Sequence, residues 1–404
     1  WVAAFGGSDL SLRFFGLVAP LGLLAALWWS ARRTNTVPLA ALSLVAIHPA
    51  FLLYGDSLRG YGLGTVAIVA AFGAFACLNR SSIAIAAAAS LAAVQLLFFN
   101  AALLLALGLA AIGGGILRRR PHAAWAAVAI GAGSALSLLP WSGSVLATRS
   151  WSGLLKIPVG PGEIFGELAR TAGPLWIWLP LVALALLPSR GDDARLFALL
   201  ALPGLVLAQW GFLEILEYRP RPWYFLAFLA VAALALDVRL STSTAGRIAR
   251  LGAAGLATLV LILPATTAAR TRMSNVDLVA ERIAAEAAPG DLVVVAPWYM
   301  GISYQRYARG PAPWMTIPDL PDHSIHRFDL LKESRVDLGA VERTLRSGGR
   351  VWLAGRLDIS SPRLAAFLSR HAARREARPV PWNGPVNGYE RLDLLVFSGW
   401  RTSG

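Results

Sequence analysis

Long apolar runs constrain this chain more than any other feature, and they recur with short breaks up to about residue 265. A helix needs about 20 mostly apolar residues to cross the hydrocarbon core of a bilayer, where every backbone polar group must be paired. The Phe98-Phe99-Asn100 turn separates two of the runs. The sequence therefore predicts ten membrane spans, near 10–30, 37–54, 61–78, 82–98, 100–117, 122–140, 174–188, 195–213, 221–238 and 247–265.

The composition changes after the last of these runs. Only 15% of the whole chain is charged, against about 25% in a typical soluble domain, but from about residue 270 the charge density returns to the soluble level. We therefore expect a mainly α, polytopic transmembrane domain over 1–268 and a small extracytoplasmic α/β domain over 269–404. Periodicity in the second part predicts helices near 275–289, 337–347 and 361–376, and strands at 292–296, 350–354 and 392–397.

The net charge of +14 does not indicate a nucleic-acid partner. In the tail, 19 basic residues are offset by 14 acidic ones and are scattered, without a basic stripe interleaved with aromatic residues. Cys77 is the one cysteine, so no disulfide can form within the chain.

The charges between the spans predict an orientation, because cytoplasmic loops carry an excess of Lys and Arg. If Arg32 and Arg33 are cytoplasmic, the loops on their side hold eleven basic and three acidic residues, a net charge of +8. The opposite loops hold seven basic and six acidic residues, a net charge of +1. The segment before the first span and the tail are then both extracytoplasmic. A chain usually starts in the cytoplasm, so we expect at least one span upstream of Trp1 that this sequence lacks.

Polar residues collect in the turns of the predicted outer face. These turns hold Asp9 and Arg13, then Asp56, Arg59 and Tyr61, then Glu214 and the stretch Glu217–Tyr224, with Glu163, Glu167 and Arg170 in a longer loop. Arg matches phosphate or carboxylate with a planar fork, and ionisable groups near a membrane are costly and often functional. The alternative is interface anchoring by aromatic residues, with Arg–Asp pairs satisfying each other. Anchoring is the better interpretation for any one residue, whereas Asp56, Arg59 and Tyr61 taken with Arg219 and Arg221 favour a binding site.

Other chemistry-bearing patterns are weak. His48, beside Pro49 in an apolar run, is interpreted as a buried, hydrogen-bonded histidine rather than a ligand. His323 and His326 lie in a Pro- and Asp-rich stretch, so a solvated loop is expected there. No set of His, Cys and carboxylate residues has metal spacing, and no phosphate-binding Gly-rich loop or nucleophile elbow occurs in the sequence.

At these outer turns the sequence resembles the GT-C superfamily of polyprenyl-phosphate-sugar-dependent membrane glycosyltransferases. The nearest resemblance is to bacterial relatives of the dolichyl-phosphate-mannose–protein mannosyltransferases. A segment of the type W…G-x-S-E-x-x-x-R is matched by Trp1, Gly7, Ser8, Asp9 and Arg13, with Asp9 replacing the usual Glu. A second motif is matched by Pro49, Tyr54, Arg59 and Tyr61, and an Arg/Tyr/Pro-rich turn by Tyr218–Pro222.

The resemblance implies an inverting transfer of a sugar from a polyprenyl-phosphate donor to a lipid, glycan or protein acceptor, at the outer face of a bacterial cytoplasmic (inner) membrane. It implies substrate-binding roles for Arg13, Asp56, Arg59, Tyr61, Arg219 and Arg221. The family's catalytic base is an Asp in the first outer loop, which on this alignment lies upstream of Trp1, so the catalytic residue is unknown and Asp9 does not replace it. A divalent metal assists some relatives, which leaves a metal cofactor open although this chain has no site for one.

Two other classes of function remain. The first alternative is a polytopic transporter or lipid flippase with an extracytoplasmic domain, which would place ionisable residues near the midplane, often with inverted repeats. Here the charges gather at span ends and no repeat is evident. The second alternative is a non-catalytic scaffold or sensor.

Overall fold

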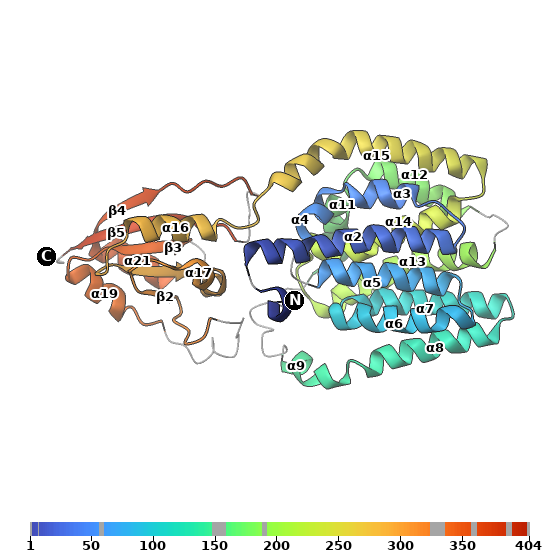
Figure 1. Ribbon diagram of the computed structural model, residues 1–404, viewed down its shortest axis with the longest axis horizontal. Coiled ribbons are helices and arrows are strands. Elements are labelled where there is room, and N and C mark those ends of the chain that lie inside the picture. The colour runs from blue at the N-terminus through green and yellow to red at the C-terminus, as the bar shows by residue number, and fades with distance from the viewer. Residues whose placement is uncertain are drawn as a thin grey trace. The chain divides into compact units, whose positions relative to one another are not determined.

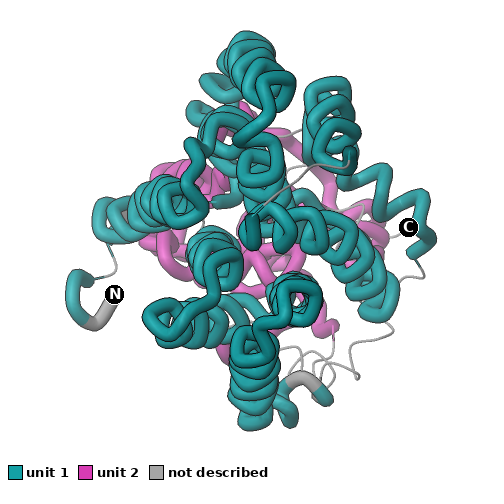
Figure 2. The backbone as a smooth tube through the Cα atoms, turned by 90° about the vertical axis from the view of Figure 1, so that its right-hand side faces the viewer, with its two compact units in different colours: residues 1–270 teal, residues 271–404 magenta. Residues whose placement is uncertain are grey.

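The computed structural model describes the chain except residues 1, 7, 56–59, 148–158, 188–191, 324–335, 357–361, 385–389 and 402–404. The chain divides into two compact units, residues 1–270 and residues 271–404 (Figure 2). We call them the helical unit and the α/β unit, and describe each by itself.

The long helices of the helical unit run side by side (Figure 1). Its elements are α1 (Val2–Phe5), α2 (Asp9–Arg33), α3 (Leu39–Ala41), the π-helix η1 (Leu42–Ala46), α4 (Pro49–Tyr54), α5 (Tyr61–Ala76), α6 (Arg80–Leu96), α7 (Asn100–Leu117), α8 (Pro121–Leu136), η2 (Leu139–Trp141), α9 (Ser142–Ala147), α11 (Pro161–Ala172), α12 (Leu175–Leu186), α13 (Asp193–Leu216), η4 (Pro222–Tyr224), α14 (Leu226–Leu240) and α15 (Thr244–Arg270).

Helix α14 forms the core of this unit, since every residue from Leu226 to Leu240 is buried. The outer helices instead expose large apolar side chains. Leu21 on α2 is 64% exposed, Trp125 on α8 72% and Leu259 on α15 76%. Water-soluble proteins rarely expose apolar surface on this scale, whereas lipid solvates it. The unit is therefore compatible with insertion into a membrane.

Five of the described helices are long and apolar enough to cross a membrane: Leu10–Arg33, Asn100–Leu117, Pro121–Ser144, Asp193–Leu216 and Thr244–Arg270. Helices α11 and α12 together make a sixth if they form one broken span, bent by 104°. The expected membrane character is thus supported, while the count of ten spans stays a prediction. The turn at Phe98–Asn100 is confirmed, because α6 ends at Leu96 and α7 begins at Asn100.

One predicted span has a different local structure. The segment 37–54 is not a single helix but α3, the π-helix η1 and α4 in succession. Pro49 has no N–H to continue a helix, and the His48 side chain instead begins a new one: its Nδ1 accepts from the Ala50 N–H at 3.2 Å. His48 is buried and hydrogen-bonded, as expected.

The α/β unit is built on a five-stranded sheet with the order β2-β1-β3-β5-β4. The strands are β1 (Leu292–Ala296), β2 (Trp314–Thr316), β3 (Val351–Gly355), β4 (Ala372–Arg378) and β5 (Leu394–Trp400). Strands β2, β1 and β3 are parallel, and β5 and β4 follow antiparallel. The register pairs Val294 with Leu353, and Leu353 with Leu395.

Helices cover both faces of this sheet. Alternate strand residues fall into two apolar clusters: Val293 and Val295 with α16 (Val276–Glu286), and Val294 with α19 (Gly339–Arg346) and α21 (Pro362–His371). The 3₁₀ turn η5 (Trp298–Met300) and helix α17 (Gly301–Tyr307) complete the first layer. The unit is therefore a three-layer α/β/α structure with a mixed sheet.

Most elements of this unit match the sequence prediction, and β1 matches it to the residue. The predicted helix 361–376 is wrong in its last five residues, where the chain leaves α21 at His371 and forms β4 along β5. Strand β2 was not predicted. The aromatic residues after β1 pack into the core: Trp298 and Tyr304 are 9% and 3% exposed.

Candidate functional site

Aromatic rings from four segments converge at one end of the helical unit. Tyr54 ends α4, Tyr61 begins α5, and Trp223 and Tyr224 form η4; Phe99 belongs to the turn before α7. The ring centroids lie 5.2 Å apart for Tyr54–Trp223, 6.2 Å for Tyr61–Trp223, 6.4 Å for Tyr61–Tyr224 and 4.7 Å for the stacked pair Phe99–Tyr224. We call these five residues the aromatic cluster.

Local sequence features bring the cluster together. A Cβ on Gly62 would lie 1.8 Å from the Gly55 carbonyl oxygen and 2.8 Å from the Ala19 Cβ, so only glycine allows α5 to approach both α2 and the end of α4 this closely. Pro222 begins η4, and the buried Gln209 side chain on α13 donates to the Tyr224 carbonyl at 3.1 Å. The Gln209 contact thus holds η4 against α13, and the close approach at Gly62 holds the start of α5 against α2 and α4.

Charged groups border the cluster. Arg221 is half-buried, and it and Glu167 of α11 both lie close enough to Tyr54 to interact electrostatically with its hydroxyl. Glu167 also pairs with the exposed Arg170 at 2.5 Å. The site thus combines flat aromatic faces, a guanidinium and a carboxylate, which together suit a sugar ring and an attached anionic group.

The structure brings together some of the predicted site residues. Tyr61 and the turn that carries Arg219 and Arg221 lie side by side, because Tyr61 contacts both Trp223 and Tyr224. Arg219 is exposed, and no carboxylate lies within ion-pair distance of Arg219 or Arg221 in the described part of the chain.

Arg13 lies apart from the cluster along α2. It is exposed. It lies six residues, or about 9 Å of helix, before Ala19, the residue of α2 that lies next to Gly62 of α5. Figure 1 shows α2 extending beyond the start of α5. Asp56 and Arg59 are outside the described residues, so their placement in the site stays a prediction.

Five contributors were not among the predicted site residues: Tyr54, Phe99, Glu167, Trp223 and Tyr224. Helix α11, which carries Glu167, lies in a stretch predicted to be a loop. Its amphipathic spacing was a usable signal, since Ile164, Leu168 and Ala172 recur every fourth residue and are buried or half-buried.

Of the two histidines in the Pro- and Asp-rich stretch, the structure describes His323. Across the residues that the structure describes, no group of three or more His, Cys, Asp and Glu side chains could hold a metal ion. His323 packs against Trp314, with ring centroids 4.7 Å apart, and burial lowers the pKa of its imidazole although Asp319 and Asp322 act to raise it. His326 lies outside the described residues.

Comparisons of the chain with protein-family models, with curated proteins and with solved structures find no match.

Proposed function

We propose that the chain is an integral membrane glycosyltransferase that transfers a sugar from a polyprenyl-phosphate donor at the aromatic cluster. The observation that carries the proposal is the convergence of Tyr61 and the Arg219–Arg221 turn, which come from distant parts of the sequence. Aromatic faces pack on sugar rings, and guanidinium groups stabilise the negative charge that a departing phosphate gains. The acceptor in this proposal is a lipid, glycan or protein hydroxyl, deprotonated by a general base.

The proposed topology has ten crossings and an outer aromatic cluster. The helix ends near Arg33, Arg118 and Arg247 are then cytoplasmic, in keeping with the net +8 predicted for that side. The α/β unit follows α15 and is extracytoplasmic in this arrangement. The membrane proposed is the bacterial cytoplasmic membrane, where polyprenyl-phosphate sugars are displayed to the outer face.

The test uses the full-length protein in membranes supplied with polyprenyl-phosphate hexose or pentose. Arg59→Ala and Arg221→Gln each remove one guanidinium from the proposed donor site, so transfer is expected to fall about 10²- to 10³-fold while expression persists. Arg247→Gln is the matched control, because Arg247 is exposed and lies in the first turn of α15, at the other end of the unit. Full activity of both site variants would refute the proposed roles.

A transporter or lipid flippase is the second candidate, and one observation favours it. Helices α11 and α12 form a pair bent by 104° at Gly173-Pro174, and broken helices are common at transporter binding sites. Movement of a polyprenyl-phosphate lipid across proteoliposome membranes without any sugar transfer would favour this candidate over the enzyme.

A further inference from the structure

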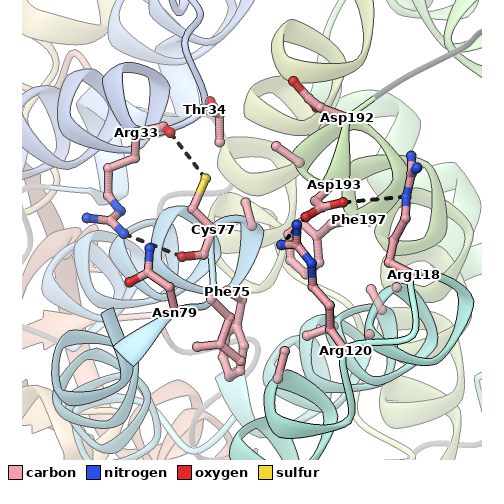
Figure 3. Close-up of a pocket in the computed structure, with 18 of the residues that line it drawn as sticks. Arg33, Thr34, Phe75, Cys77, Asn79, Arg118, Arg120, Asp192, Asp193 and Phe197 are labelled. Atoms are coloured by element: carbon pink, nitrogen blue, oxygen red, sulfur yellow. Dashed lines mark hydrogen bonds and ion pairs between the residues drawn. The ribbon is translucent and has the colours of Figure 1, made fainter. Parts of the chain in front are cut away.

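A pocket of about 440 Å³ opens at the other end of the helical unit. It lies between the ends of α2, α5 and α7 and the beginnings of α6, α8 and α13 (Figure 3). The proposed function assigns no role to it.

Arginines line two walls of this pocket. Arg33 lies on one wall and Arg118 and Arg120 on the other, as Figure 3 shows. The two lining carboxylates already have cations: Asp193 pairs with Arg118 at 3.4 Å and with Arg120, and Asp192 pairs with Arg195 at 3.5 Å. Among the described residues of the lining, three guanidinium groups therefore face two carboxylates, and Asp192 also pairs with Arg195 outside the lining, which leaves a net positive charge for a ligand.

Arg33 has hydrogen-bonding capacity to spare. It lies over the Trp29 ring at 5.2 Å, and it donates to the Cys77 carbonyl at 3.5 Å, which is a long hydrogen bond. Its Nε–H is buried and has no acceptor among the residues that the structure describes. A buried donor without an acceptor is costly, and an anion in the pocket would relieve that cost.

The rest of the lining is apolar and made of small residues. Ala110, Ala111, Gly114 and Gly115 of α7 hollow one side, and Phe75 and Phe197 contribute aromatic faces. A free phosphate would leave this surface empty, whereas an amphiphile would place an anionic group on the arginines and an apolar part along α7.

We propose that this pocket binds the phosphate headgroup of an anionic phospholipid, with Arg33 as its principal ligand and the Ala110–Gly115 surface against the glycerol and first methylenes. Basic pockets between membrane helices bind such headgroups on the cytoplasmic side. On the topology proposed above, this end faces the cytoplasm. The inference does not depend on the enzymatic activity.

Binding of a tritiated short-chain phosphatidic acid to the purified full chain in detergent tests the proposal. Arg33→Gln removes the ligand, and Gly114→Leu fills the hollow, because a Cβ on Gly114 meets nothing within 4 Å. Each is expected to weaken saturable binding by about tenfold or more. The matched controls are Arg32→Gln, an exposed neighbour of equal charge, and Gly108→Leu, on the same helix with equally open space.

The controls are expected to bind within about twofold of the parent chain. Equal binding by all four variants, or binding that does not saturate, would overturn the site. Displacement of the lipid by inorganic phosphate at equal concentration would overturn the lipid assignment, since the apolar surface would then contribute nothing. If Gly114→Leu does not fold, Arg33→Gln still decides the outcome.

Discussion

At the scale of single residues, the buried pair Asp237–Arg250 shows how the helical unit tolerates charge. Asp237 is fully buried in α14 and accepts from the N–H groups of Ala40 and Ala41 at 3.0 and 2.8 Å. Arg250 of α15 donates to the same carboxylate at 3.2 Å and to the Val37 carbonyl at 3.0 Å. The pair therefore ties three segments, the start of α3, α14 and α15, at one point.

Removal of one partner is expected to cost more than removal of both. Asp237→Ala and Arg250→Ala each leave the other charge buried without its partner, so each should lower the free energy of unfolding by about 3–5 kcal/mol. The double variant leaves no unpaired ion, so its cost should be well below the sum of the two. Equilibrium unfolding in mixed micelles measures this cycle, and strictly additive losses would show that the two side chains do not interact.

Asp291 makes a pH-dependent contribution in the α/β unit. Burial acts to raise its pKa, but hydrogen bonds from the Ala288 and Arg350 N–H groups, the Trp352 indole and the Arg350 guanidinium outweigh burial and hold the pKa below 3.8. Since the folded-state pKa is the lower one, the carboxylate stabilises the fold at neutral pH. That stability is lost as the pH falls through the folded-state pKa.

Asp291→Asn should therefore destabilise the unit at pH 7 by about 1.5–3 kcal/mol, and by less near pH 3. Hydrogen exchange of β3 in the full chain, measured at both pH values, reports the difference. Asp277→Asn is the control, because its pair with Arg272 is 38% and 40% exposed and worth little. An equal loss at both pH values would contradict the assignment.

At the scale of elements, the sequence predicts helices best where apolar runs have clear ends. The run 100–117 is α7 to the residue, since Asn100 begins it and Arg118 follows it. The run 37–54 breaks at His48-Pro49, because a proline cannot continue a helix. Segment 372–378 has the Ala, Arg and Glu content of a helix, yet it pairs with β5, so a tertiary contact overrides local propensity.

In the candidate site, too, tertiary contacts decide what local sequence patterns do not. The Tyr61 and Arg221 segments were predicted as one group from their shared side of the membrane, and the contacts of Tyr61 with η4 place their segments together. The role of α11 depends on packing against η4 and α13, which no local pattern encodes.

The close approach at Gly62 is the element contact on which the aromatic cluster depends. Gly62→Val adds atoms where the Gly55 carbonyl and Ala19 already lie, so α5 must move away from α2 and α4. Overpacking of this kind costs about 1–3 kcal/mol, and the melting temperature should fall by several degrees. Reaction of Cys77 with a thiol-reactive dye on heating follows unfolding, and Gly108→Val, where space is open, should melt close to the parent chain.

At the scale of the whole molecule, helix α15 gives the clearest test of membrane crossing. Its 27 residues span about 40 Å, enough for the roughly 30 Å hydrocarbon core. Thr242 precedes it, and Ser347 lies in the α/β unit that follows it; both are exposed. Two residues on either side of one crossing must face opposite compartments.

We expect a membrane-impermeant maleimide to label Ser347→Cys in intact spheroplasts, in a Cys77→Ala background, and to reach Thr242→Cys only after permeabilisation. His122→Cys, exposed at the start of α8, should behave like Thr242→Cys, because four proposed crossings separate the two positions. One of those four is the bent pair α11–α12, whose amphipathic first half could lie along the membrane surface instead. If the pair did not cross, His122→Cys and Thr242→Cys would face opposite sides. The labelling of His122→Cys and Thr242→Cys therefore decides whether the α11–α12 pair crosses the membrane, and with it the count of ten spans.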